Sequence, residues 1–307
     1  MSLAQRIVVC YNKRSSRFRE ISSEVLEPIR RGDFSIQGRK LELCEFEIKQ
    51  ASVLANARRL AKVVRDKDIV ISAGGDGTAT ATLNGVILSG KTGVRFSALP
   101  YGNFNDTARL FGVRKLADIL GRLDLDERTR ELYPLEMLVN GKHFRYAACY
   151  FTVGMFAEST EAFNNTRVRK SLISGKRSVF FSGLTLFSWW RKNRKKQFFP
   201  EDFPATDVLA INGRSVAKIM KGDADLAFSE IGFLASKQKL SGFFAIGWFM
   251  MRSIIRRVPG KVADSVRLAF SKPYEVEIQA EGEYERKKCR EIEIRKAASP
   301  VAVICRK

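Results

Sequence analysis

Apolar residues in the first part of the chain follow two different spacings. Runs of consecutive or alternating apolar residues are typical of strands, and recurrence every three or four positions is typical of helices. This pattern predicts strands at 5–11, 41–46, 68–72 and 94–100, and helices at 17–31, 52–65, 78–89 and 114–124. Strands and helices that alternate in this way form an α/β domain around a parallel sheet. We therefore expect a Rossmann-like domain over residues 1–130.

From about Leu132 the pattern changes to the two-residue period of strands. Asn-Gly turns between apolar runs predict hairpins at 132–154 and 206–219, and a third hairpin is expected within 274–296. Residues 131–307 are thus predicted to form a β-rich, β-sandwich-like domain. The last strand, PVAVIC, is compatible with either domain.

Composition adds one unusual property, a formal charge of +21. Residues 1–134 carry 23 Lys and Arg against 16 Asp and Glu, a net charge of +7. The remaining residues carry 31 against 17, a net charge of +14, so most of the positive charge lies in the second part of the chain. A charge of this size favours an anionic partner such as a nucleic acid, an anionic lipid surface or a phosphorylated substrate.

Cysteine and histidine usage excludes several kinds of site. None of the five cysteines forms a C-x-x-C pair, which indicates buried thiols of a cytoplasmic protein and neither disulfides nor zinc ligands. The single histidine, His143, follows a turn and is expected at the surface. No apolar run is long enough for an ordinary transmembrane helix, and the N-terminus lacks a signal-peptide layout.

The stretch SAGGDGT, residues 72–78, follows a predicted strand and precedes a predicted helix. Gly74, Gly75 and Gly77 lack Cβ atoms, so backbone N–H groups there can approach phosphate oxygens closely. The helix N-terminus favours anions, and Thr78 can cap the helix or donate to phosphate. Asp76 would repel a phosphate unless it holds Mg²⁺ or takes a proton from an attacking hydroxyl. The residues alone leave a phosphate-binding loop and a structural turn as alternatives.

A second polar loop, LPYGNFNDTARLFG, follows the predicted strand at 94–100. Pro100 ends that strand, Gly102 permits a turn, and Asn103, Asn105 and Asp106 supply polar groups. Loops that follow parallel strands lie at the same edge of the sheet, so this loop is expected beside the first. Taken alone, it is an Asx-rich turn that caps a helix.

Together, these loops resemble the diacylglycerol kinase catalytic domain family, which includes bacterial lipid kinases and sphingosine kinases and is related to NAD kinases. The family's Gly-Gly-Asp-Gly-Thr is intact at 74–78 and is followed by its Asn-Gly at 84–85. PYGNFNDTAR, at 100–109, matches its Pro-x-Gly-Thr-x-Asn-Asp-x-Ala-Arg. Gly154 and the Glu-Gly-Glu at 281–283 match later family positions, so the resemblance covers nearly the whole chain.

The resemblance implies that ATP binds in a cleft between the two domains and that Asp76 acts as a base or as an Mg²⁺-linked carboxylate. The implied nucleotide-binding residues are Asn12, Ser15, Gly74, Gly75, Gly77, Thr78, Gly102, Asn103, Asn105, Asp106, Glu281 and Glu283. The reaction would be in-line attack of a lipid hydroxyl on the γ-phosphate, with Mg²⁺ neutralising charge. The resemblance assigns no metal ligands.

Several positions depart from the family pattern. The early Asn-Pro-x-Ser-Gly is here Asn-Lys-Arg-Ser-Ser at 12–16, which keeps Asn12 and Ser15 but loses the proline and the glycine. A family glutamate is replaced by Ala81, and a family threonine by Asn103. A threonine expected near Lys49 is absent, and the acidic stretch of many bacterial lipid kinases is not clear around FSEIGFLAS, 228–236.

Two basic aromatic segments, 162–200 and 231–263, contain every tryptophan of the chain and no acidic residue. Tryptophan and clustered basic residues favour membrane interfaces, and each apolar stretch is too short to span a bilayer. These segments predict a cytoplasmic protein that docks peripherally on an anionic membrane to reach a lipid alcohol. The alternative is that the aromatic side chains pack against the β-rich domain.

Four functions remain open from the sequence. The first is an ATP- and Mg²⁺-dependent lipid kinase that acts on a diacylglycerol-like alcohol. The others are a non-catalytic nucleotide- or lipid-binding protein, an NAD-kinase-like enzyme, and a nucleic-acid binder. Only the charge suggests nucleic acid, since no RNA- or DNA-binding motif accompanies it. We therefore do not expect nucleic acid as a partner.

Overall fold

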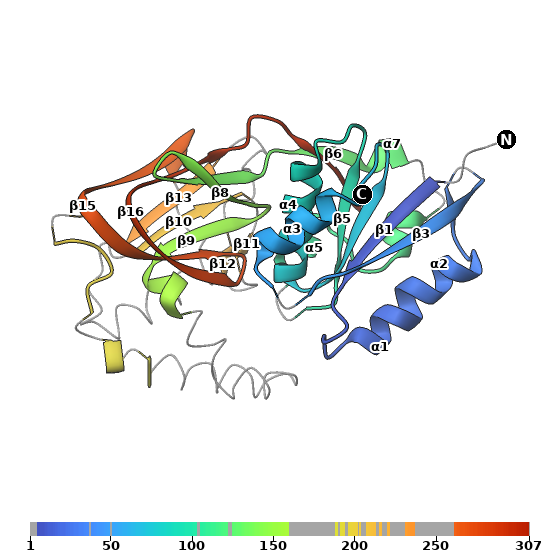
Figure 1. The fold of residues 1–307 in the computed structure, drawn as a ribbon, viewed down its shortest axis with the longest axis horizontal. Helices are drawn as coiled ribbons and strands as arrows, with labels where there is room; N and C mark the ends of the chain where they lie inside the picture. Colours follow the sequence, from blue (N-terminus) through green and yellow to red (C-terminus); the bar gives the residue numbers. More distant parts are fainter. Residues whose placement is uncertain are drawn as a thin grey trace. The chain divides into compact units, whose positions relative to one another are not determined.

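The computed structural model forms two compact units (Figure 1). Unit 1 comprises residues 1–134, 145–149 and 297–307, and unit 2 comprises 135–144 and 150–296. The structure describes residues 5–36, 38–49, 51–102, 105–121, 125–159, 188–189, 191–193, 196–201, 203, 207–212, 215–216, 220–221, 231–236 and 261–306.

Unit 1 is built on a seven-stranded sheet in the order β2-β3-β1-β4-β5-β17-β6. Its strands are β1 (Gln5–Tyr11), β2 (Ser35–Ile36), β3 (Arg39–Glu47), β4 (Ile69–Gly74), β5 (Arg95–Pro100), β6 (Thr129–Leu132) and β17 (Val301–Ile304). The five strands from β3 to β17 run parallel, and only β2 and β6 at the edges pair antiparallel. Every residue of β4 is buried, which explains its uninterrupted apolar character.

Helices cover both faces of this sheet (Figure 1). The helix predicted at 17–31 consists of α1 (Phe18–Ile21), a π-helical turn η1 (Ser22–Leu26) and α2 (Glu27–Arg31). The others are α3 (Val53–Ala61), α4 (Asp76–Ser89), α5 (Asp106–Leu110), α6 (Ala117–Leu120) and α7 (Leu125–Arg128). The helix predicted at 114–124 is thus too long, because α6 ends where Gly121 adopts an extended conformation.

Unit 2 contains an eight-stranded antiparallel sheet in the order β14-β13-β10-β9-β15-β16-β7-β8. The strands are β7 (Leu135–Val139), β8 (Lys142–Ala147), β9 (Tyr150–Gly154), β10 (Asp207–Ile211), β13 (Ile231–Ser236), β14 (Lys261–Ala263), β15 (Ser265–Ala280) and β16 (Glu283–Lys296). An α/β unit and a β unit are therefore both present, as the fold class predicted.

Two of the three predicted hairpins are correct. Asn140 and Gly141, with φ of 51° and 73°, join β7 to β8, and Glu281 and Gly282, with φ of 50° and 91°, join β15 to β16. Consecutive positive φ values are the geometry of a tight hairpin turn. The hairpin predicted at 206–219 is wrong, because β11 (Ser215–Val216) pairs with β12 (Met220–Lys221) and β10 pairs with β9 and β13.

The structure also shows where the cysteines and the single histidine lie. Cys10, Cys149 and Cys289 are buried free thiols, and Cys44 and Cys305 are partly exposed. His143 is at the surface, where its Nδ1 lies 3.0 Å from Glu136 Oε1. In the part of the chain that the structure describes, no helix is long and apolar enough to cross a membrane. Most of segments 162–200 and 231–263 lies outside that part.

Candidate nucleotide-binding site

The loop between β4 and α4 has a geometry that only glycine permits. A Cβ atom on Gly74 would lie 2.6 Å from Thr78 Oγ1, closer than non-bonded atoms approach. Gly75 is the N-cap of α4 and offers no side chain to the helix. Among the described residues, the N–H groups of Gly77 and Thr78 and the Thr78 hydroxyl have no hydrogen-bond partner. The loop thus presents unpaired donors at the positive end of a 14-residue helix.

The second loop touches the first. Tyr101 donates its N–H to the carbonyl of Gly74 at 3.2 Å. A Cβ atom on Gly102 would lie only 2.3 Å from the Cα atom of Gly75. The two backbones are therefore in direct contact, and any side chain at Gly102 would push the loops apart.

Asp76 joins the two loops through its carboxylate. Its Oδ2 accepts the N–H of Asn105 at 3.0 Å, and its Oδ1 accepts the N–H of Asp106 at 2.7 Å. These donors lie at the N-terminus of α5, so Asp76 caps a helix that starts 30 residues later in the sequence. Sequence reasoning gave Asp76 a chemical role but missed this structural one.

The surroundings of Asp76 raise its pKa from an ordinary 3.8 to about 6. Burial is the largest cause, and the nearby negative charge of Asp106 adds to it. Hydrogen bonds from the backbone N–H groups of the second loop oppose the shift without cancelling it. The carboxylate is therefore a stronger base than an ordinary aspartate and is still mostly ionised at neutral pH.

Asn105 shapes the second loop from within. It adopts a left-handed conformation, with φ of 55°. Its side-chain Oδ1 accepts the N–H of Gly102 at 2.6 Å, and its Nδ2 donates to the carbonyl of Gly102 at 2.8 Å. Asp106 is fully buried and forms an ion pair with Arg109. Asn105 and Asp106 thus build the loop, whereas Asn103 lies outside the described residues.

Asn12 and Ser15 lie in the turn after β1. Asn12 Oδ1 accepts the N–H of Arg14 at 2.8 Å, and Ser15 Oγ accepts the N–H of Arg17 at 3.3 Å. Both side chains are therefore used to fold the turn, as expected for Asx and Ser turns. They remain partly exposed at the carboxyl end of β1, the neighbour of β4 in the sheet.

Arg17 is a site residue that the sequence did not reveal. Its guanidinium group donates to the carbonyl of Pro100 at 3.0 Å and lies 5.1 Å from the centroid of the Tyr101 ring. It also forms an ion pair with Glu20. The Tyr101 hydroxyl in turn donates to Glu24 in the π-helical turn, at 2.8 Å. The second loop is thereby tied to the first helix of unit 1.

Asn84, part of the family's Asn-Gly pair, anchors the residues of β8 that belong to unit 1. Its Nδ2 donates to the carbonyl of Tyr146 at 2.8 Å, and its Oδ1 accepts the N–H of the same residue at 2.9 Å. A Cβ atom on Gly85 would lie 2.7 Å from a methyl carbon of Leu60, so this glycine allows α3 and α4 to pack closely. Ala81, on the same helix, is buried.

Glu281 and Glu283 lie in unit 2, at the turn between β15 and β16. Glu281 is one of the two turn residues and is almost fully buried, whereas Glu283 is the first residue of β16 and is partly exposed. Asn12, Ser15, Asp76 and the two glycine loops belong to unit 1, whereas Glu281 and Glu283 belong to unit 2.

The chain is similar to one family model and to solved structures of other proteins. Residues 6–132 match the family described as the diacylglycerol kinase catalytic domain. A crystal structure of a diacylglycerol kinase from Bacillus anthracis strain Sterne has a TM-score of 0.59 at 15% identity and covers 99% of this chain and 98% of its own. An NAD kinase from Archaeoglobus fulgidus in complex with ATP has a TM-score of 0.46 at 11% identity, over 99% of this chain and 94% of its own. None of the curated proteins matches the sequence significantly.

Proposed function

We propose that the chain transfers the γ-phosphate of ATP to the hydroxyl group of a diacylglycerol-like lipid, because residues 6–132 match the diacylglycerol kinase catalytic domain family. The observation that carries this proposal is the arrangement of the Gly74–Thr78 loop. It combines unpaired N–H donors at a helix N-terminus with Asp76, a carboxylate whose pKa is raised to about 6. The first feature suits a phosphate group, and the second suits proton transfer.

In the proposed complex, the N–H groups of Gly77 and Thr78 donate to phosphate oxygens of ATP, together with the Thr78 hydroxyl. The dipole of α4 favours the negative charge that accumulates there. Gly102 keeps the second loop against the first, so the donors retain their positions without rearrangement. Arg17 supports the same geometry from the other side, through the carbonyl of Pro100.

Asp76 is proposed to take the proton of the attacking lipid hydroxyl. Its two oxygens accept backbone N–H groups of Asn105, Asp106 and Thr107, and a carboxylate has about four acceptor sites, so one remains for this purpose. The hydroxyl oxygen forms a bond to the γ-phosphorus while the bond from that phosphorus to the bridging oxygen of ADP breaks. The lost proton passes to Asp76, and ADP leaves with the electron pair of the broken bond.

Mg²⁺ fits this group of residues as an ion that arrives with the nucleotide. Among the residues that the structure describes, no cluster of three His, Cys, Asp or Glu side chains is suited to hold a metal. Mg²⁺ is commonly bound by one or two carboxylates together with substrate phosphates. The ion would be held by phosphate oxygens and water and would neutralise charge on the phosphates, so that Asp76 stays available as the base.

The test is transfer of labelled γ-phosphate from ATP to diacylglycerol in mixed micelles, measured in the organic phase. We expect labelled phosphatidic acid, and a loss of at least about 100-fold with Asp76→Asn, the usual size of a general-base contribution. Asp33→Asn, which changes an exposed aspartate of the same unit, should keep full activity. Full activity of Asp76→Asn would refute the proposed role of this residue.

One alternative has a specific observation in its favour. Ala81 is buried where the family carries a glutamate, and the turn at 12–16 has lost the family's proline and glycine. ATP binding without transfer to any lipid alcohol or to NAD would support a nucleotide-binding protein that does not catalyse. Transfer to NAD alone would support an NAD-kinase-like enzyme.

We also propose that the basic aromatic segments bring the protein to an anionic membrane surface. In the described part of segment 162–200, Trp189 is partly exposed and Arg191 and Lys192 are exposed. Basic residues near an anionic surface contribute about 1 kcal/mol each. Sedimentation with vesicles should show binding when anionic lipid is present and none with purely zwitterionic lipid. Absence of binding at low salt would exclude this docking.

A further inference from the structure

The long hairpin of β15 and β16 in unit 2 is interrupted by a β-bulge. The pairing register shifts between Ala269 and Tyr274, so that residues 270–273 of β15 stand opposite Arg290 of β16 alone. Extra residues without partners loop out of a sheet and disrupt its ladder of hydrogen bonds. Bulges occur preferentially at sheet edges and beside functional sites, so the surface next to this one is a candidate binding surface.

A groove of about 430 Å³ lies beside the bulge. Its lining residues are Asn140, Pro273, Lys288, Cys289, Arg290 and Glu291. The backbone of the groove is fixed, because Asn140 Oδ1 accepts the N–H of Arg290 at 2.8 Å and the N–H of Glu291 at 3.2 Å. Pockets of about 300–1,000 Å³ hold small molecules, so this volume suits one small ligand or head group.

The basic side chains at the groove are available to a ligand. Lys288 and Arg290 are both exposed, and so is Lys272 in the bulge itself. Within the part of the chain that the structure describes, none of these three side chains forms an ion pair. Cys289 is only 1% exposed and contributes little surface. The groove therefore presents cations whose charge is not used for folding.

The acidic residues around the groove are paired with other cations. Glu291 Oε1 lies 2.6 Å from Nε of Arg267. Glu275, which faces Lys288 in the strand register, lies 3.9 Å from Nη1 of Arg286. The groove thus keeps an excess of positive charge, which favours an anionic ligand.

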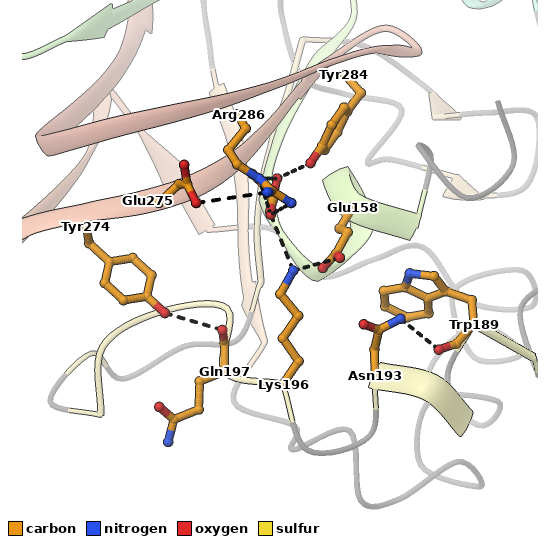
Figure 2. Close-up of polar contacts among 10 residues, drawn as sticks. Glu158, Trp189, Asn193, Lys196, Gln197, Tyr274, Glu275, Tyr284 and Arg286 are labelled. Carbon is orange, nitrogen blue, oxygen red and sulfur yellow. Dashed lines mark hydrogen bonds and ion pairs between the residues drawn. The ribbon is translucent and has the colours of Figure 1, made fainter. Parts of the chain in front are cut away.

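The same bulge packs against the end of the basic aromatic segment 162–200. The ring centroids of Phe270 and Phe199 are 6.1 Å apart. The hydroxyl of Tyr274 donates to the carbonyl of Gln197 at 3.3 Å (Figure 2). The groove therefore adjoins the segment that we propose to dock on an anionic membrane. This continuity favours one class of anion, the phosphate-bearing head group of a phospholipid, over a nucleic acid or an acidic protein.

We propose that the groove lined by Lys288 and Arg290 binds the phosphate of an anionic phospholipid head group and thereby holds unit 2 on the membrane surface. Lys288 supplies a point charge, and Arg290 supplies a planar fork of donors that matches phosphate oxygens. The inference rests on the proposed membrane docking, to which it adds a defined head-group site. It does not depend on the phosphate-binding loop of unit 1 or on the identity of the kinase substrate.

The test is sedimentation of the full chain with vesicles of equimolar phosphatidylcholine and phosphatidylglycerol, without ATP. Lys288→Gln combined with Arg290→Gln should weaken binding about 25-fold, because each basic residue near an anionic surface contributes about 5-fold. The matched control combines Arg58→Gln and Lys62→Gln, which remove the same two charges from exposed positions of α3 and its C-cap, and should bind as the wild type does. Thermal unfolding should be the same for all three proteins.

Competition by phosphate separates head-group recognition from general attraction. Sodium phosphate should release the wild type from the vesicles at a lower ionic strength than sodium chloride does, and this difference should vanish in the groove variant. Equal release by the two salts, or an equal loss of binding in the control variant, would overturn the inference. So would a wild type that binds a polyglutamate peptide but not the vesicles.

The outcomes also separate the groove from the proposals on which it draws. If the wild type binds the vesicles and the groove variant binds equally well, the head-group site is refuted and docking through the basic aromatic segments stands. If the wild type does not bind the vesicles at low salt, both are refuted. Head-group binding of the expected pattern without phosphoryl transfer would keep the site and refute the kinase function.

Discussion

Asp76→Asn is expected to change how the stability of the protein depends on pH. The pKa of Asp76 is raised from 3.8 to about 6, so the folded protein binds this proton more tightly than the unfolded chain. Its contribution to stability is therefore most favourable below about pH 4 and is lost as the pH rises through about 6. Asparagine carries no proton to titrate and removes this dependence.

The size of the effect follows from the two pKa values. With 3.8 for the unfolded chain and about 6 for the folded protein, ionisation costs about 1.6 kcal/mol at pH 5 and about 3 kcal/mol at pH 7.5. Asparagine also turns one accepting oxygen into an N–H donor that faces a backbone N–H, at a cost of about 1–3 kcal/mol that is independent of pH. The stability of Asp76→Asn relative to the wild type should thus improve by about 1.4 kcal/mol from pH 5 to pH 7.5.

Urea denaturation of both proteins at the two pH values, followed by far-ultraviolet circular dichroism, measures this double difference. Titrating groups that do not interact with Asp76 cancel, because both proteins contain them. Asp33→Asn, the same substitution at an exposed aspartate of unit 1, is the matched control. A difference between Asp76→Asn and the wild type that stays constant across this range would refute the argument that Asp76 is held in a costly ionised state.

The other predictions concern the contacts that shape the site. Gly102→Ala places a Cβ atom 2.3 Å from Gly75 Cα and should lower ATP affinity at least about 10-fold in equilibrium binding, since the loops must separate; unchanged affinity would contradict the contact. Asn84→Ala removes both hydrogen bonds to Tyr146 and should lower the free energy of unfolding by about 2–3 kcal/mol in urea denaturation. Arg17→Met frees the second loop and should raise the KM for ATP severalfold while kcat changes little; an equal fall in kcat would assign Arg17 to the chemical step.

The two glycine loops were predictable from the sequence because residues that are neighbours in the chain define them. An apolar run followed by Gly74 and Gly75 marks the end of a buried strand, and parallel strands bring such ends to one edge of a sheet. The turns at 140–141 and 281–282 were predictable for the same reason, since two residues suffice to define a hairpin. The hairpin at 206–219 failed because the pairing of β10 with β9 and β13 depends on strands far away in sequence.

What the sequence by itself determined is therefore the alternation of the main strands and helices of unit 1, two of the hairpin turns, the glycine loops and the candidate chemistry of Asp76. The tertiary structure alone decided how these groups act. The pKa of Asp76 rises because folding buries it beside Asp106, and its partners arrive from a loop 29 and 30 residues away. Lys196 likewise forms ion pairs with Glu158 and Glu277, which are 38 and 81 positions away in the sequence. Burial and Coulomb interactions depend on distances in space, which only the packing of the folded chain defines.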